Sequence, residues 1–226
     1  MKKLQLSPSI LTADFARLGE QVALVGPIVD WFHLDVMDGH YVPNITFGPS
    51  VVEAIRRSCD LPLHVHLMIQ DPLAYAATFA EAGATRISFH PEVTEEPGEV
   101  IARLKELGVG PGLAIHPDIP VDVAEPYVAD LEVLLMMTVR PGFGGQAFLH
   151  EVVPKIELAR DLLTRTGQSA DIEVDGGVNL TTVDEAVAAG AEILVAGSAV
   201  FDGKDPLAAA ERMRERLDAL ERMRSE

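Results

Sequence analysis

The feature that most constrains the fold is a regular alternation of short β-rich runs and longer amphipathic segments. The alternation repeats about every 28 residues, as expected of βα units on a parallel sheet. The β-rich runs predict eight strands, at 4–9, 31–36, 63–68, 86–89, 112–115, 133–137, 172–174 and 193–196. The amphipathic segments predict eight helices, at 15–25, 49–57, 72–81, 95–107, 121–127, 151–165, 181–189 and 206–223.

Glycine and proline mark the ends of the predicted helices. Pro72 and Pro206 each begin a helix, and an aspartate that can cap the helix precedes each of them. Four glycines fall between a predicted helix and the next strand, where a left-handed residue is favoured: Gly83, Gly108, Gly167 and Gly190. No linker or change of composition interrupts the series of units, so residues 1–226 are predicted to form a single domain. Eight units in one domain favour a closed (β/α)8, or TIM, barrel over an open doubly wound sheet.

The charge of the chain limits its partners. The formal net charge is -17, and no basic stripe is present, which argues against nucleic acid and anionic membranes. The N-terminus lacks the apolar core of a signal peptide, and no apolar run is long enough to span a bilayer. We therefore expect a cytoplasmic protein. Any anionic ligand would need local positive potential on a protein that is acidic overall.

Two histidines and two aspartates are candidate metal ligands. In a strand, residues two apart point to the same face, so His33 and Asp35 share a face, and His66 and Asp175 lie near the ends of their own strands. If those faces point inward, the four side chains converge at the carboxyl end of the barrel, where active sites of this fold lie. Such a set suits Zn²⁺, Fe²⁺, Mn²⁺ or Co²⁺. The alternative is that each histidine is an ordinary core or surface residue, and the convergence of four such groups makes that alternative weaker.

His64 and Glu173 share these inward faces one layer deeper. Two interpretations have about equal weight. The two residues either orient the metal ligands or form a buried polar pair of the barrel core.

Glycine-rich turns at 141–146, 175–177 and 196–198 follow the sixth, seventh and eighth predicted strands. Glycine allows backbone N–H groups to approach an anion closely, and barrels often bind phosphate after strands seven and eight. A single such turn would more often reflect loop geometry alone. Three at the same end of the barrel favour a phosphate ligand that is bound without lysine or arginine.

The chain resembles the ribulose-phosphate 3-epimerase family from its first strand to its last. The resemblance is carried by Ser-Pro-Ser-Ile-Leu (7–11), Ala-Asp-Phe (13–15), His-Leu-Asp-Val-Met-Asp-Gly (33–39), Val-Pro-Asn (42–44), His-Leu-Met (66–68), Pro-Gly-Phe-Gly-Gly-Gln (141–146), Val-Asp-Gly-Gly (174–177) and Ala-Gly-Ser (196–198). It implies an isomerase of the pentose phosphate pathway that interconverts D-ribulose 5-phosphate and D-xylulose 5-phosphate by 1,1-proton transfer through an enediolate. It also implies one divalent metal ion, and a homo-oligomer, because relatives form dimers or hexamers.

The same resemblance assigns roles to residues. It implies Asp35 as proton acceptor and Asp175 as proton donor, and it implies the metal ligands His33, Asp35, His66 and Asp175. The implied substrate contacts are Ser9, His66, Gly142, Phe143, Gly144, Gly145, Asp175, Gly176, Gly177, Gly197 and Ser198. Met37, Met68 and Met137 match methionines near the metal, although core packing explains them nearly as well.

Some positions depart from the family, and they leave alternatives open. The chain has His-Pro-Asp-Ile-Pro at 116–120 where the family usually has Asn-Pro-Ala-Thr-Pro, and Arg140 stands where Asn is frequent. These departures bear on the choice of sugar, so an epimerase of another ketose phosphate, such as allulose 6-phosphate, is the alternative function. His116 is predicted to be a surface loop residue, and a new contact near the mouth of the barrel is the alternative. A decarboxylase on a related barrel and a catalytically inactive sugar-phosphate sensor fit the acid pair less well.

Overall fold

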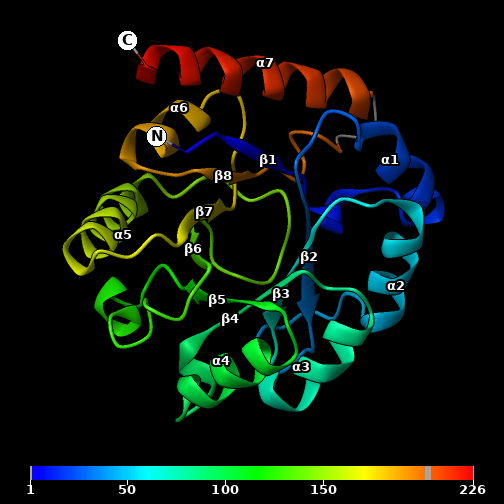
Figure 1. The fold of residues 1–226 in the computed structure, drawn as a ribbon. Coiled ribbons are helices and arrows are strands. Elements are labelled where there is room, and N and C mark those ends of the chain that lie inside the picture. Colours follow the sequence, from blue (N-terminus) through cyan, green and yellow to red (C-terminus); the bar gives the residue numbers. More distant parts are fainter. Residues whose placement is uncertain (1, 202–204, 226) are drawn as a thin grey trace.

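The structure, a computed structural model, describes residues 2–201 and 205–225. Eight strands pair in parallel in the order β1-β8-β7-β6-β5-β4-β3-β2, as the sequence predicts (Figure 1). Their bounds are β1 Gln5–Ser7, β2 Phe32–Met37, β3 Leu63–Met68, β4 Arg86–Phe89, β5 Gly110–Ile115, β6 Val133–Met137, β7 Asp171–Asp175 and β8 Ile193–Val195.

The two end strands of this order, β1 and β2, close the barrel through a short contact. A single parallel bridge joins Ser9 to His33, and the His33 N–H donates to the Pro8 carbonyl at 3.0 Å. Lower on the same seam, the Trp31 N–H donates to the Leu6 carbonyl at 3.3 Å. Among the described strands, the seam between β1 and β2 is thus the only neighbour contact made through an isolated bridge rather than a ladder, and His33 takes part in it.

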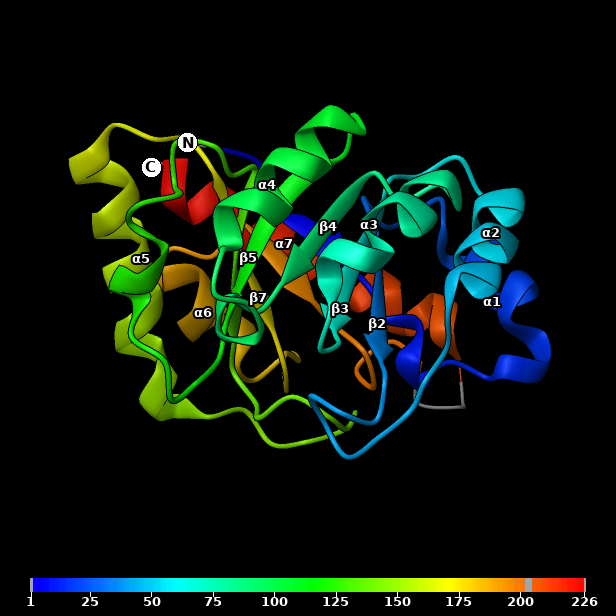
Figure 2. The ribbon, with the colours of Figure 1, turned by 90° about the horizontal axis from the view of Figure 1, so that it is seen from below.

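Helices surround the strands, as Figures 1 and 2 show. The α-helices are α1 Leu18–Val25, α2 Pro49–Ser58, α3 Pro72–Glu81, α4 Pro97–Glu106, α5 Val153–Thr166, α6 Val183–Ala189 and α7 Pro206–Ser225. The start of α3 follows the predicted rule, because Pro72 is the first helical residue and the Asp71 carboxylate accepts the Ala74 N–H at 3.0 Å. The four glycines predicted at helix ends all have positive φ. No helix in the described ranges is both long and apolar enough to cross a membrane.

The predicted helix at 121–127 is wrong as an α-helix. The segment forms only a short 3₁₀ helix, η4 Val121–Ala124, followed by turns, so the described ranges contain seven α-helices rather than eight. Pro126 explains the difference, because it has no N–H to donate to the carbonyl four residues earlier. The first predicted helix, 15–25, likewise begins as the 3₁₀ helix η2 Phe15–Arg17 before α1.

Two kinds of packing meet at the strands. Residues such as Leu34, Val65 and Leu67 belong to the large apolar core that includes the inner faces of the helices. Their neighbours in sequence are the buried polar residues of β2 and β3, among them His33 and His66. Because side chains alternate along a strand, the apolar set packs against the helices and the polar set points into the interior. The interior also contains apolar residues of β6, since Leu135 and Met137 lie beside Glu173 and Asp175 in the register. A group of buried ionisable side chains in a barrel interior indicates a functional site.

Candidate active site

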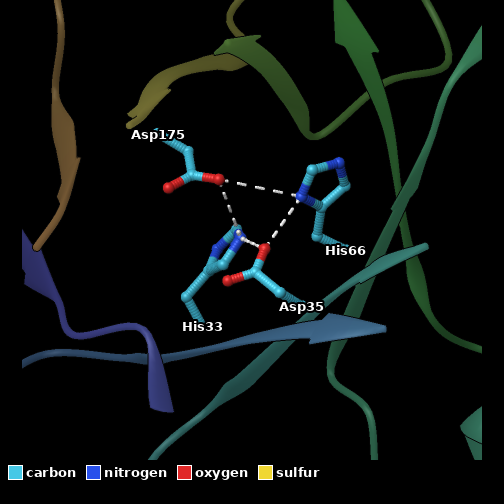
Figure 3. A group of neighbouring side chains, drawn as sticks. All are labelled: His33, Asp35, His66 and Asp175. Carbon is cyan, nitrogen blue, oxygen red and sulfur yellow. Dashed lines mark hydrogen bonds and ion pairs between the residues drawn. The ribbon is translucent and has the colours of Figure 1, made fainter. Parts of the chain in front are cut away.

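Four side chains meet at the carboxyl end of the barrel (Figure 3). His33 and Asp35 project from β2, and Asp35 lies directly opposite His66 of β3 in the register of the two strands. Asp175 ends β7, three strand positions away around the barrel from β2. The structure thus brings together the four residues that the sequence predicts as metal ligands, and Asp35 and Asp175 reach one centre from opposite walls.

The donor atoms of the four residues are close enough to share one ion. Nε2 of His33 lies 3.2 Å from Asp35 Oδ1 and 3.8 Å from Asp175 Oδ2. Nδ1 of His66 lies 3.1 Å from Asp35 Oδ1 and 3.8 Å from Asp175 Oδ2. The second oxygen of Asp35 accepts a hydrogen bond from the Ser9 hydroxyl at 2.5 Å. Ser9 therefore fixes the rotation of the Asp35 carboxylate.

Glu173 supports this group from below, one inward layer deeper on β7. Its Oε1 lies 2.9 Å from Nδ1 of His33, and its Oε2 lies 2.7 Å from Nδ1 of His64. The other nitrogen of His64 meets the Ser88 hydroxyl at 2.7 Å. All four side chains are buried. Of the two interpretations of His64 and Glu173, the geometry favours support, because Glu173 turns Nε2 of His33 toward the aspartates.

The pKa values of the two aspartates are shifted in opposite directions. Burial would raise the pKa of Asp35, but the charge of His33 beside it and the contacts with the His33 and His66 rings outweigh burial and hold that pKa well below its usual range. Burial and the negative charge of Asp35 raise the pKa of Asp175 well above its ordinary value. Burial lowers the pKa of His33, yet Asp35, Glu173 and Asp175 raise it further than burial lowers it. At neutral pH the group therefore favours an ionised Asp35 beside a protonated Asp175.

The residues fit a divalent ion. One ligand atom from each of the four lies within 4.8 Å of all the others, and ligands about 2.0–2.2 Å from a common ion would be separated by similar distances. Nε2 of His33 is buried and makes no hydrogen bond, although it faces two carboxylates. A second group, made by His33, His64 and Glu173, is also compact, but its atoms already bond to one another and to Ser88. The upper group is the better metal site.

A pocket opens above these residues, with about 530 Å³ of empty space when its open mouth is counted. Asp35 and Asp175 lie in its wall, whereas His33 and His66 are buried beneath it. The other predicted contacts in the lining are Ser9, Gly142, Phe143, Gly144, Gly145, Gly176, Gly177, Gly197 and Ser198, together with Met37, Met68 and Met137. Among the described residues of the lining there is no lysine or arginine. All the predicted substrate contacts except His66 therefore share one pocket.

Gly177 requires glycine for reasons of the fold itself. Its φ is +66°, and a Cβ at this position would lie 2.4 Å from the backbone nitrogen of Phe148. Gly145, with a φ of +72°, has open space where a Cβ would be. Close packing alone explains why residue 177 is glycine, so the number of glycines in these turns is not evidence of a ligand. The position of all three turns around one pocket is the stronger indication of an anion site.

Sequence reasoning missed Thr12, which lines the pocket between two of the glycine turns. Its Oγ1 is buried and makes no hydrogen bond. A Cβ on Gly197 would lie 3.2 Å from this Oγ1, and a Cβ on Gly144 would lie 2.8 Å from the Thr12 Cγ2. The two glycines thus leave room for the Thr12 side chain, Gly197 beside its hydroxyl and Gly144 beside its methyl group. The signal lay in the position of Thr12 directly after Ser-Ile-Leu at the end of the first strand.

His90 was missed as well. It follows β4, is fully buried, and its Nε2 lies 2.9 Å from Nε2 of His66. Strand alternation could have found it, since Ser88 and His90 are two residues apart and Ser88 points inward.

The residues that depart from the family lie outside the pocket lining. Arg140 pairs through one nitrogen with both oxygens of Asp118, at 3.0 and 3.2 Å, and its side chain is largely exposed. His116 is partly exposed, as predicted for a loop residue, and Lys155 donates to its carbonyl at 3.1 Å. The Arg140–Asp118 pair joins the loop after β6 to the loop after β5, and Lys155 joins the loop after β5 to α5.

Comparison with known proteins gives a consistent result. The family model described as "Ribulose-phosphate 3 epimerase family" matches residues 5–201. Ribulose-phosphate 3-epimerase of Bacillus subtilis is 48% identical over 204 residues, which cover 89% of this chain and 94% of that one. The enzyme of the same name from Escherichia coli is 42% identical over 219 residues, which cover 96% and 97%. That of Mycobacterium leprae is 41% identical over 215 residues, which cover 95% and 96%.

Solved structures share the fold at low sequence identity. KGPDC from Streptococcus mutans has a TM-score of 0.75 at 14% identity, covering 97% of this chain and 99% of that one. A 3-hexulose-6-phosphate synthase has a TM-score of 0.73 at 20% identity, with coverage of 94% and 99%. These likenesses support the TIM barrel.

Proposed function

This chain belongs to the ribulose-phosphate 3-epimerase family and is an epimerase, and we propose that it interconverts D-ribulose 5-phosphate and D-xylulose 5-phosphate in the pentose phosphate pathway. The relatives named above carry ribulose phosphate in their names, and their similarity extends over nearly the whole chain. The cytoplasmic location and the homo-oligomer stay predictions.

The observation that carries the proposal is the pair of carboxylates on opposite walls of one pocket. The Asp35 carboxylate reaches the pocket from β2, and the Asp175 carboxylate reaches it from β7. Each carboxylate lies within 3.8 Å of the same two nitrogens, Nε2 of His33 and Nδ1 of His66. Inversion of a carbon next to a ketone requires a base on one face and an acid on the other. Two acids across a narrow floor meet that requirement.

In the proposed reaction, Asp35 takes the proton from C3 of the ketose, and the electron pair of that C–H bond moves toward the C2 carbonyl to give an enediolate. Asp175 then delivers a proton to C3 from the opposite face, and the carbonyl re-forms. The two pKa directions support these starting states, because Asp35 begins ionised and Asp175 begins protonated. In the reverse direction the two residues exchange roles. Ser9 holds the Asp35 carboxylate in place through its 2.5 Å hydrogen bond.

His33, Asp35, His66 and Asp175 would hold one divalent ion, of Zn²⁺, Fe²⁺, Mn²⁺ or Co²⁺. When bound, such an ion supplies Lewis-acid stabilisation of the negative charge that develops on the substrate oxygens. Met37, Met68 and Met137 line the pocket beside the acids. Their apolar side chains limit the access of water to the carbon that exchanges its proton.

The phosphate would bind at the rim formed by the turns after β6, β7 and β8. Gly144, Gly177 and Gly197 lie in this rim, and their backbone N–H groups supply positive potential without a charged side chain. Ser198 and Thr12 add hydroxyl donors, and the buried Oγ1 of Thr12 has no protein partner. This arrangement explains how an acidic chain, with a formal net charge of -17, would accept an anionic substrate.

Steady-state assays on ribulose 5-phosphate and on allulose 6-phosphate test the proposal. We expect a higher kcat/KM for the five-carbon sugar. A strong preference for allulose 6-phosphate would replace the pentose assignment, and inactivity on both sugars would reject the proposed substrate class.

A further inference from the structure

A row of three side chains extends from the buried face of His66 to the surface, and no step of the proposed reaction uses it. His66 Nε2 lies 2.9 Å from His90 Nε2, and the two rings are 5.1 Å apart between their centroids. His90 Nδ1 in turn lies 3.5 Å from Oε1 of Glu92. The Tyr41 hydroxyl donates to the same Oε1 at 2.7 Å, and its ring stacks on His90 at 4.7 Å.

We propose that His90, together with Glu92 and Tyr41, is a positioning relay that fixes the tautomer of His66 and thereby strengthens binding of a divalent ion at its Nδ1. The proposal rests on the metal site of the proposed function. None of these three residues lines the pocket, and His90 reaches the site through its contact with His66. Tyr41 also packs against the cluster of Met37, Val42 and Met68, so the test is made at His90 and Glu92.

The two histidines carry fewer N–H groups than they have polar contacts. Three contacts follow one another from Asp35 to Glu92: Asp35 with His66 at 3.1 Å, His66 with His90 at 2.9 Å, and His90 with Glu92 at 3.5 Å. Two neutral imidazoles carry two N–H groups between them, so they can fill only two of the three contacts. In this structure the contact between His90 and Glu92 is the longest, and His90 Nδ1 makes no hydrogen bond.

A cation at Nδ1 of His66 removes the conflict. The ion needs the lone pair of that nitrogen, so the N–H of His66 must lie on Nε2. His66 then donates to Nε2 of His90, and His90 carries its own N–H on Nδ1, facing the Glu92 carboxylate. The N–H of His66 and the N–H of His90 then each have an acceptor, and the ion occupies the contact between His66 and Asp35. Glu92, held by Tyr41, selects this direction because an anion at the end of the row attracts the His90 N–H.

The alternative is that His90 only fills space in the barrel. His90 is fully buried and stacked on two rings, so its loss would affect stability in either case. Gln and Met separate the two roles because they have similar size. The Gln amide oxygen can accept from Nε2–H of His66, whereas the Met sulfur is a weak acceptor.

The test measures the dissociation constants of Zn²⁺ and Co²⁺ for the full chain by competition with a chelator. For His90→Met we expect affinity to fall about 10- to 100-fold, the range for loss of a partner of a metal-bound histidine. His90→Gln should restore most of it, and Glu92→Gln should show a smaller loss than His90→Met. His116→Gln is the control, because His116 is a half-buried histidine at the end of the next strand with no contact to His66.

Nitrogen NMR of the zinc-loaded protein reads the tautomers directly, and we expect the proton of His66 on Nε2 and that of His90 on Nδ1. The relay is overturned if His90→Met binds zinc within twofold of the original chain, or if His90→Gln binds as weakly as His90→Met. Failure of the unchanged protein to bind any of the four candidate cations would instead reject the metal site of the proposed function.

Discussion

Oε1 of Glu173 lies 2.9 Å from Nδ1 of His33, and this contact directs the opposite nitrogen of the ring toward Asp35 and Asp175. A carboxylate behind a histidine fixes the orientation of its ring and raises the basicity of the nitrogen that faces an ion. The same carboxylate also contacts His64, so one buried glutamate orients two rings.

Replacement of this carboxylate by an amide of the same shape should weaken metal binding. We expect Glu173→Gln to fold and to bind zinc about 10- to 100-fold more weakly, because the charge behind His33 is gone. Glu192→Gln is the matched control: Glu192 is also buried, but it pairs with Arg160 before β8. Titration calorimetry gives both affinities. Equal affinities in the two variants would remove Glu173 from the metal site.

Loss of either proton-transfer group should nearly abolish turnover. Each of Asp35→Asn and Asp175→Asn is expected to lower kcat by at least about 10²- to 10⁴-fold, the usual contribution of an acid or base. Circular dichroism should show an intact fold. Asp161→Asn, on the exposed face of α5, should retain full activity. Substantial turnover by either site variant would contradict the two-acid mechanism.

Removal of metal should stop the reaction, and readdition of Zn²⁺, Fe²⁺, Mn²⁺ or Co²⁺ should restore it. Normal activity in fully metal-free protein, verified by elemental analysis, would exclude His33 and His66 as ligands of a required ion.

Metal binding should become stronger as pH rises. In the metal-free protein the pKa of His33 is raised by the neighbouring carboxylates, so its ring favours the protonated form at neutral pH. An ion at Nε2 of His33 must displace the proton of that nitrogen, and the displaced proton adds up to about tenfold in affinity per pH unit below its pKa. Calorimetry in two buffers of different ionisation enthalpy counts the protons released. An affinity independent of pH would contradict the assignment of His33 as a ligand.

Thr12 provides a test of the phosphate subsite. Thr12→Val keeps the shape of the side chain and removes the hydroxyl that has no protein partner. We expect a higher KM with little change in kcat, since a contact to phosphate is made equally before and during the reaction. Ser198→Asp should raise KM further by repulsion. Unchanged KM in both variants would locate the phosphate elsewhere.

The sequence predicted the barrel well because strand alternation and helix-end signals are local. Pro72 after Asp71 begins α3 as expected, and the inward face of β2 was correctly assigned to His33 and Asp35. The failed helix at 121–127 shows the limit of periodicity, since Pro126 cancels an apolar pattern that otherwise favours a helix.

The site was predicted less completely than the fold. His33, Asp35, His66 and Asp175 could be named because residues two apart share a strand face and three of the four lie near the ends of their strands. The link between His66 and His90 could not be predicted, because it depends on how two rings from neighbouring strands rotate in the interior. Thr12 was missed for a similar reason: its role depends on two glycines more than 100 residues away in the chain.

We expect the barrel to open first at the seam between β1 and β2. His33 contributes its backbone N–H to the closure of the wall and its ring to the centre that would hold an ion. Local unfolding begins where few hydrogen bonds hold a segment, and at this seam detachment of β1 would disturb the ligand set. A ligand that binds only the closed form suppresses such opening. A bound ion would therefore stabilise the attachment of β1 to β2. The rate of amide hydrogen exchange along the seam would show whether the metal site is occupied.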